Sequence, residues 1–162
     1  MKLLITGGAG FIGSNFILHM MNSHPEVEII NLDILTYAGN LNNLKSVEKN
    51  PRYTFIKGDI CDPDLVNAIL DRYKVDTIVH FAAESHVDRS IIKASEFVRT
   101  NVLGTYNLLE CARLHSIGKF IHISTDEVYG STLKESFDEE DILSPSSPYS
   151  ASKAGSDLLA LS

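Results

Sequence analysis

Two adjacent carboxylates have the types and spacing that acid–base chemistry needs. Asp126 and Glu127 lie in the stretch STDEVY, directly after the apolar run KFIHI. When two carboxylates are held close together and partly buried, one can stay protonated while the other stays ionised. The pair can therefore supply a proton donor and a proton acceptor to one reaction. A solvated turn is the alternative interpretation.

A tyrosine and a lysine form a second candidate pair. Tyr149 and Lys153 are four residues apart in YSASK, so on a helix they share one face. Pro148 and the serines before it are typical of a helix start. A neighbouring ammonium favours phenolate and lowers the pKa of Tyr149 from about 10 towards neutrality. Such a tyrosine can take a proton from a hydroxyl group. Alone, the pattern usually marks a solvated helix face.

A glycine-rich turn near the N-terminus predicts a dinucleotide site. Gly7, Gly10 and Gly13 lie in TGGAGFIG, between a β-rich run and a helical pattern. The first glycine allows a tight turn, the second lets the backbone approach a pyrophosphate, and the third brings the helix close to the sheet. The N-terminus of that helix then offers unpaired N–H groups to the phosphates.

Asp33 supports this interpretation and indicates which dinucleotide is bound. It closes the second β-rich run about twenty residues past the last glycine, where an acidic residue accepts the ribose hydroxyls. Ile34 and Leu35 follow, and neither can pair with a 2′-phosphate, so the sequence favours NAD over NADP. The alternative is that Asp33 is only a turn residue.

Two further strand ends carry candidate cofactor residues. Asp59 and Ile60 follow the third β-rich run and could flank the adenine. Phe81, Ala82 and Ala83 follow the fourth, where small residues let the backbone pass close to a dinucleotide. Either segment could equally be a plain turn.

The elements that must position these residues alternate along the chain. Strands are expected at 2–6, 27–32, 53–57, 76–81 and 119–124, and helices at 11–23, 64–73, 90–115 and 149–162, with a loop and short helix at 37–50. This alternation predicts an α/β fold, a doubly wound parallel sheet of the Rossmann type with strand order 3-2-1-4-5. Ligands of such sheets bind beyond the carboxyl ends of the strands.

Composition limits the class of protein. The 162 residues are 44% hydrophobic and 22% charged, which suits one globular domain over 1–162. A net charge of -7 argues against nucleic acid or an anionic membrane as a partner. Cys61 and Cys111 form neither a disulfide framework nor a metal motif, so we expect no metal and a cytoplasmic location. The chain stops within a helical pattern, so we expect a sheet truncated before its closing strands and a C-terminal substrate domain.

Taken together, the motifs resemble a known family. TGGAGFIGSN, Asp33, FAAESHVDRS, STDEVYG and YSASK are similar to those of the extended short-chain dehydrogenases/reductases, and within them to the dTDP-glucose 4,6-dehydratases. The resemblance spans the whole chain. Asp126 with Glu127 is its most discriminating part, because related epimerases carry small residues there and GDP-mannose dehydratases lack the aspartate.

The resemblance implies roles for individual residues. Tyr149 would deprotonate the sugar 4-hydroxyl, Glu127 would remove the proton at C5, and Asp126 would protonate the departing 6-hydroxyl. Thr125 and Ser85 would contact the substrate, and Lys153 would bond the nicotinamide ribose. The positions matching the family's cofactor residues are Gly7, Gly10, Phe11, Ile12, Gly13, Asp33, Ile34, Leu35, Thr36, Asp59, Ile60, Phe81, Ala82, Ala83, Glu84, Ser85, Thr100, Tyr149 and Lys153.

The implied reaction converts dTDP-glucose to dTDP-4-keto-6-deoxyglucose and water with NAD, in deoxysugar biosynthesis of the rhamnose type.

A homodimer paired through the helices at 90–115 and 149–162 is also implied, although the apolar residues of the first of these helices could equally be core: Val98, Val102, Leu108 and Leu109. Members of the family are about twice as long, so this chain alone is expected to show little activity. A nucleotide-sugar 4-epimerase and an NAD-binding protein without turnover remain the alternatives. The acidic run at Glu135 and 138–141 is expected to be a solvated loop.

Overall fold

The computed structural model describes residues 1–133 and 136–162, which group into two compact units. The first unit comprises residues 1–82 and 107–123, and the second comprises residues 83–106 and 124–162. The interpretation of 1–162 as one cofactor-binding domain stays a prediction. Residues 138–140 are exposed, as expected for a solvated acidic loop, whereas Glu135 lies outside the described residues.

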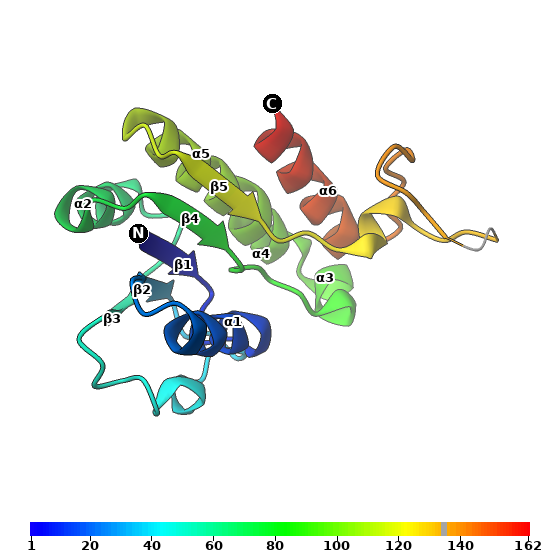
Figure 1. Ribbon diagram of the computed structural model, residues 1–162. Helices are drawn as coiled ribbons and strands as arrows, with labels where there is room; N and C mark the ends of the chain where they lie inside the picture. The colour runs from blue at the N-terminus through cyan, green and yellow to red at the C-terminus, as the bar shows by residue number, and fades with distance from the viewer. Residues whose placement is uncertain (134–135) are drawn as a thin grey trace. The chain divides into compact units, whose positions relative to one another are not determined.

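The first unit is built on a parallel sheet, shown in Figure 1. Its strands are β1 (Lys2–Thr6), β2 (Glu28–Asp33), β3 (Tyr53–Lys57), β4 (Thr77–His80) and β5 (Lys119–His122). Among the described residues they form one five-stranded sheet in the order β3-β2-β1-β4-β5, and every pairing is parallel. The predicted fold class and strand order are therefore confirmed.

Helices cover both faces of this sheet because successive side chains of a strand point to opposite faces. Leu3 and Ile5 of β1 pack with Ile17 of α1 (Phe11–Ser23) and with Leu44 of the short helix η1 (Leu41–Leu44). Leu4, between them, packs on the other face with residues of α2 (Pro63–Tyr73) and α5 (Thr105–Leu114). In Figure 1, α1 lies on one side of the sheet and α2 on the other. Burial on both faces explains why β1, β2 and β4 read as largely apolar runs, whereas the edge strands β3 and β5 are partly exposed.

The second unit is helical among its described residues. It contains α3 (Val87–Ile92), α4 (Ala94–Phe97), the π-helix η2 (Val98–Gly104), the short helix η3 (Asp126–Tyr129) and α6 (Pro148–Leu161). The rings of Phe97 and Tyr149 meet edge to face, with centroids 6.3 Å apart. Both side chains are buried, so they form the centre of this unit.

The single helix expected at 90–115 is wrong in detail. The helix breaks at Lys93, whose φ of -136° and ψ of 61° are not helical, and the chain then passes through α4 and the π-helix before α5. Within the π-helix, the side chain of Asn101 bonds Glu84 and Ser152, so the departure from α-helical geometry at residues 98–104 coincides with contacts to other segments.

A serine pair fixes the start of α6. The Oγ of Ser147 accepts the backbone N–H of Ser150 at 3.0 Å, and the Oγ of Ser150 accepts the backbone N–H of Ser147 at 3.0 Å. This reciprocal capping box, followed by Pro148 in the first turn, explains why the helix begins where the sequence predicts it.

Candidate active site

The glycine turn of the first unit is shaped for close backbone approach. Gly7 has a φ of 71°, and a Cβ placed on it would lie 2.5 Å from the backbone N of Ala82. A Cβ on Gly13 would lie 2.5 Å from the carbonyl oxygen of Gly7. Gly10 is the N-cap of α1, so the turn leads directly into a helix N-terminus. Gly7 and Gly13 are therefore required by close packing of the turn against its own chain, and the helix N-terminus that follows offers N–H groups of the kind that bind a pyrophosphate.

Asp33 ties the end of β2 to this turn. Its Oδ2 accepts the backbone N–H of Ala9 at 2.9 Å, and its Oδ1 accepts the backbone N–H of Leu35 at 2.8 Å. A carboxylate oxygen has two lone-pair sites, so each oxygen keeps capacity for a ribose hydroxyl. Asp33 is therefore more than the turn residue of the alternative interpretation, because it also positions the glycine turn.

The remaining predicted cofactor residues of the first unit follow the carboxyl ends of its strands. Phe11 and Ile12, at the N-terminus of α1, are exposed apolar side chains, as is Ile34 after β2. Asp59 and Ile60 follow β3, and Phe81 and Ala82 follow β4, with the backbone of Ala82 packed against Gly7. The members of this set in the first unit are Gly7, Gly10, Phe11, Ile12, Gly13, Asp33, Ile34, Leu35, Thr36, Asp59, Ile60, Phe81 and Ala82. Their contact with a cofactor stays a prediction.

The second unit holds the segment from Ala83 to Ser85 in place through Asn101. The Oδ1 of Asn101 accepts the backbone N–H of Glu84 at 2.8 Å, and its Nδ2 donates to the carbonyl oxygen of Glu84 at 2.9 Å. The same Nδ2 donates to the hydroxyl of Ser152 on α6 at 2.8 Å. Asn101 is 1% exposed and follows Thr100 in the π-helix. Burial raises the pKa of the Glu84 carboxyl.

The predicted catalytic residues come together within the second unit. Thr125 is the N-cap of η3, and its hydroxyl accepts the backbone N–H of Glu127 at 3.3 Å. A side-chain hydrogen bond also joins Thr125 to Tyr149 of α6. Lys153 lies on the next turn of α6 and is 4% exposed. One threonine therefore connects the carboxylate turn to the tyrosine.

The exposure of Asp126 and Glu127 corrects one expectation. Partial burial was expected to separate their protonation states, but both side chains are exposed. The two carboxylates are exposed because the residue that η3 buries is Val128, and the preceding side chains of this short helix face solvent. Their like charges at adjacent positions remain as predicted.

The expected fall in the pKa of Tyr149 is also wrong for this structure. Burial raises the pKa of the phenol, and the negative charges of Glu127, Asp126 and Asp157 raise it further, while the hydrogen bond from Thr125 lowers it. Burial likewise lowers the pKa of Lys153 from 10.5 to about 8, although the charge of Asp157 opposes this fall. Desolvation is the largest cause of the shift for both groups, and the negative charges near Tyr149 act in the same direction as its burial.

Sequence reasoning missed Asn101 and Asp157. Nothing in the sequence around Asn101 indicates its bonds to Glu84 and Ser152, because both partners are distant from it in the chain. Asp157 had a signal, since it is four residues past Lys153 and extends the Tyr149–Lys153 helix face by one turn. Its carboxylate accepts the hydroxyl hydrogen of Ser124 at 2.5 Å.

Within residues 1–133 and 136–162, no cluster of three or more His, Cys, Asp or Glu side chains is arranged to hold a metal ion. Over the same residues, no helix has the length and apolar character to cross a membrane.

The five-stranded parallel sheet in the order 3-2-1-4-5 is the fold that the resemblance implies for an extended short-chain dehydrogenase/reductase. The chain matches the family described as GDP-mannose 4,6 dehydratase over residues 4–162, and it belongs to that family. It is 53% identical over 167 residues to the dTDP-glucose 4,6-dehydratase of Streptomyces antibioticus, covering 100% of this chain and 48% of that protein. The chain spans about half the length of the curated relatives it matches.

Solved structures agree with this assignment. The crystal structure of DesIV, the dTDP-glucose 4,6-dehydratase of Streptomyces venezuelae with NAD and TYD bound, is 55% identical with a TM-score of 0.94, covering 99% of this chain and 50% of that one. The UDP-Glc/GlcNAc 4-epimerase of Campylobacter jejuni is 33% identical with a TM-score of 0.90, covering 98% of this chain and 47% of that one. The fold is shared with both, and the identity is higher to the dehydratase.

Proposed function

We propose that the protein is an NAD-dependent dehydratase that converts dTDP-glucose to dTDP-4-keto-6-deoxyglucose and water. One observation carries the proposal. A turn with adjacent carboxylates, Asp126 and Glu127, is hydrogen-bonded through Thr125 to a tyrosine that shares a helix face with Lys153. Elimination of water needs an acid and a base, and oxidation of a hydroxyl needs a further base, so the arrangement offers every proton-transfer group.

The glycine turn and Asp33 fit NAD. The glycine turn leads into the N-terminus of α1, whose N–H groups suit a pyrophosphate, and the carboxylate of Asp33 suits a ribose hydroxyl. The chemistry that bound NAD would supply at this site is reversible acceptance of a hydride from the sugar. The residues proposed to hold NAD are the cofactor residues named above for the first unit, together with Ala83, Glu84, Ser85 and Thr100 of the second unit.

The chain's own residues would divide the proton transfers. Tyr149 takes the proton of the 4-hydroxyl, and the 4-ketone that results makes the hydrogen at C5 acidic. Glu127 would then remove that proton while Asp126 gives one to the departing 6-hydroxyl, which leaves as water. As hydride returns to C6, the proton held by Glu127 would return to C5, and the proton taken up by Tyr149 would replace, through solvent, the one that Asp126 gave. Thr125 bonds the 4-oxygen, and the Lys153 ammonium stabilises the phenolate of Tyr149.

Product analysis tests the proposal. The protein made from its complete gene is incubated with dTDP-glucose and NAD, and the product is followed by proton NMR and mass spectrometry. We expect loss of one water and a new methyl group at C6. A product of unchanged mass with inverted C4 would identify an epimerase instead, and unchanged substrate with bound NAD would identify a protein without turnover.

A homodimer is proposed as the working state, supported by an apolar surface on the second unit. Val98 and Leu103 of η2 and Leu158 and Leu161 of α6 are at least half exposed, whereas Leu108 is fully buried and belongs to the core. Light scattering tests this proposal through the mass of the protein in solution. We also propose a cytoplasmic location, supported by Cys61 and Cys111, which form no disulfide among the described residues.

A further inference from the structure

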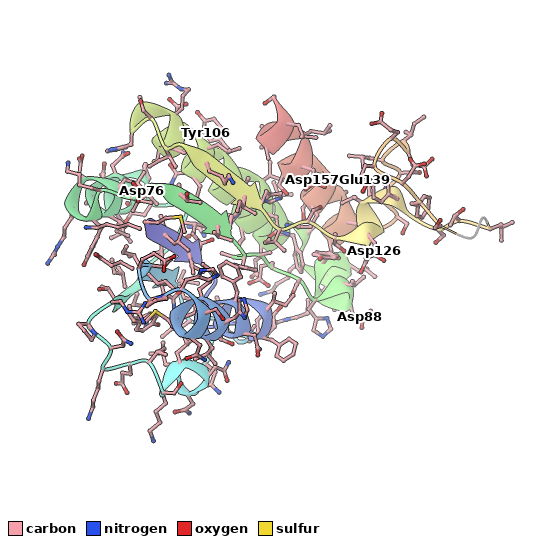
Figure 2. All side chains as sticks on the ribbon, in the orientation of Figure 1. Asp76, Asp88, Tyr106, Asp126, Glu139 and Asp157 are labelled. Atoms are coloured by element: carbon pink, nitrogen blue, oxygen red, sulfur yellow. The ribbon has the colours of Figure 1, made fainter. Side chains whose placement is uncertain are left out.

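A carboxylate that the proposed function leaves unused shares the catalytic face of α6. Tyr149, Lys153 and Asp157 follow one another at intervals of four residues, so their side chains leave the helix on the same side. Figure 2 labels Asp157 on α6 and Asp126 on the short helix η3 of the same unit. Asp157 is half-buried.

The carboxylate of Asp157 is anchored to the chain that leads into the acid–base turn. The Oγ of Ser124 donates to the Oδ2 of Asp157 at 2.5 Å, a short bond of the kind a charged acceptor makes. Ser124 directly precedes Thr125, which caps η3 and bonds Tyr149. The segment is thus attached to α6 at two points, Tyr149 and Asp157, which lie two turns apart on the helix.

Asp157 also acts on Lys153. Lys153 is buried, so its ammonium has lost most of its hydration, and burial lowers its pKa to about 8. Among the described residues, the charge that opposes this fall is that of Asp157. The other ionisable side chains on α6 and on the elements packed against it are Tyr149, Asp126, Glu127, Tyr129, Asp88, Arg89, Glu96 and Arg99.

We propose that Asp157 is a positioning residue that keeps Lys153 in its ammonium form and fixes Ser124 ahead of the acid–base turn. This inference rests on the proposed function, since the ammonium is what stabilises the Tyr149 phenolate. Asp157 itself takes no proton from the substrate. Its effect reaches the reaction through Lys153 and through Thr125, and its charge also raises the pKa of Tyr149 directly.

The direct test is the titration of Lys153, followed by NMR of lysine labelled at Cε. Asp157→Asn keeps the shape of the side chain and removes its charge, so we expect Lys153 to lose its proton about one pH unit lower. Asp157→Glu keeps the charge and is expected to titrate with the wild type. Ser124→Ala keeps the carboxylate and is expected not to lower the titration of Lys153.

An unmoved Lys153 titration in Asp157→Asn overturns the proposal. If that variant does not fold, as judged by circular dichroism, the other two decide. A downward shift in Asp157→Glu or in Ser124→Ala would contradict a role carried by the charge of Asp157.

Kinetics provide the second readout. As Lys153 loses its proton, turnover should fall, so the alkaline limb of the kcat profile moves about one pH unit lower in Asp157→Asn, with about tenfold less turnover above that limb. KM should stay close to that of the wild type, because Asp157 does not contact substrate. A wild-type protein without dehydratase activity would refute the proposed function, while the NMR titration would still decide the role of Asp157. An alkaline limb that does not move, in an active enzyme, refutes the inference alone.

Discussion

The carboxylate of Asp33 receives the backbone N–H of Ala9 at 2.9 Å and so joins the end of β2 to the glycine turn. Its second oxygen receives the N–H of Leu35 at 2.8 Å. The residue expected to bind a ribose is therefore also the residue that fixes the turn expected to bind the pyrophosphate. Changes at Asp33 should affect both ends of the proposed adenosine site.

Asp33→Asn should weaken NAD binding by tenfold or more. Asparagine offers one acceptor oxygen, so one of the two backbone N–H groups would face an NH₂ group, at a cost of about 1–3 kcal/mol. Isothermal titration with NAD measures the loss. Asp76→Asn is the matched control, because Asp76 also accepts a backbone N–H, that of Lys2 at 2.7 Å, before β4 begins. Equal losses of affinity in both variants would contradict a specific role for Asp33.

Gly7→Ala should destabilise the protein and remove NAD binding. The φ of 71° is costly for alanine, by roughly 1–2 kcal/mol, and the new Cβ would overlap the backbone of Ala82. Urea denaturation and NAD titration check the two effects. Gly118→Ala is the control, since a Cβ there would lie 3.7 Å from its nearest neighbour and should change little. A stable Gly7→Ala protein with normal NAD affinity would refute this account of the turn.

Glu127→Gln should stop turnover after the first oxidation. Loss of the base proposed to act at C5 should lower product formation by roughly 10²–10⁴-fold. Behind burial, the charge of Glu127 is a cause of the raised pKa of Tyr149, so its removal should move the acid limb of the oxidation step to lower pH. Rapid mixing, with the absorbance of the reduced nicotinamide as signal, measures that limb. Glu139→Gln, at an exposed position in the acidic loop, should change neither property.

Lys153→Met should abolish a rise in stability between pH 8 and pH 10. Burial lowers the pKa of Lys153 in the folded state from 10.5 to about 8. Between those values the unfolded chain binds more protons than the folded one, so the free energy of unfolding should rise with pH, by at most about 3 kcal/mol. Urea denaturation at intervals of pH tests this, with Lys45→Met at an exposed site as the control. A rise that persists in Lys153→Met would assign it to another group.

Much of the architecture was predictable because it depends on local patterns. The buried strands read as apolar runs, the right-handed crossover rule orders them, and glycine spacing marks the turn after β1. The start of α6 was equally visible in Pro148 and the serines around it.

The rest depends on contacts between distant segments. Helical periodicity around residues 90–115 could not reveal the break at Lys93 or the bonds of Asn101 to Glu84 and Ser152. The spacing of Tyr149 and Lys153 also could not show that burial would be the main cause of the pKa shifts of both side chains. Asp157 lay at a visible interval from Lys153, but only the folded unit joins it to Ser124.

The Ser147–Ser150 capping box has a consequence for how the chain ahead of it can change. Each residue of a helix is turned by about 100° from the last, so a start displaced by one residue would swing the whole face of Tyr149, Lys153 and Asp157 away from Thr125. The two serines, which take no part in the proposed reaction, therefore fix the residue at which α6 begins and with it the direction in which Tyr149, Lys153 and Asp157 point. Insertions or deletions before Ser147 leave the direction of that face unchanged for as long as the serine pair still starts the helix.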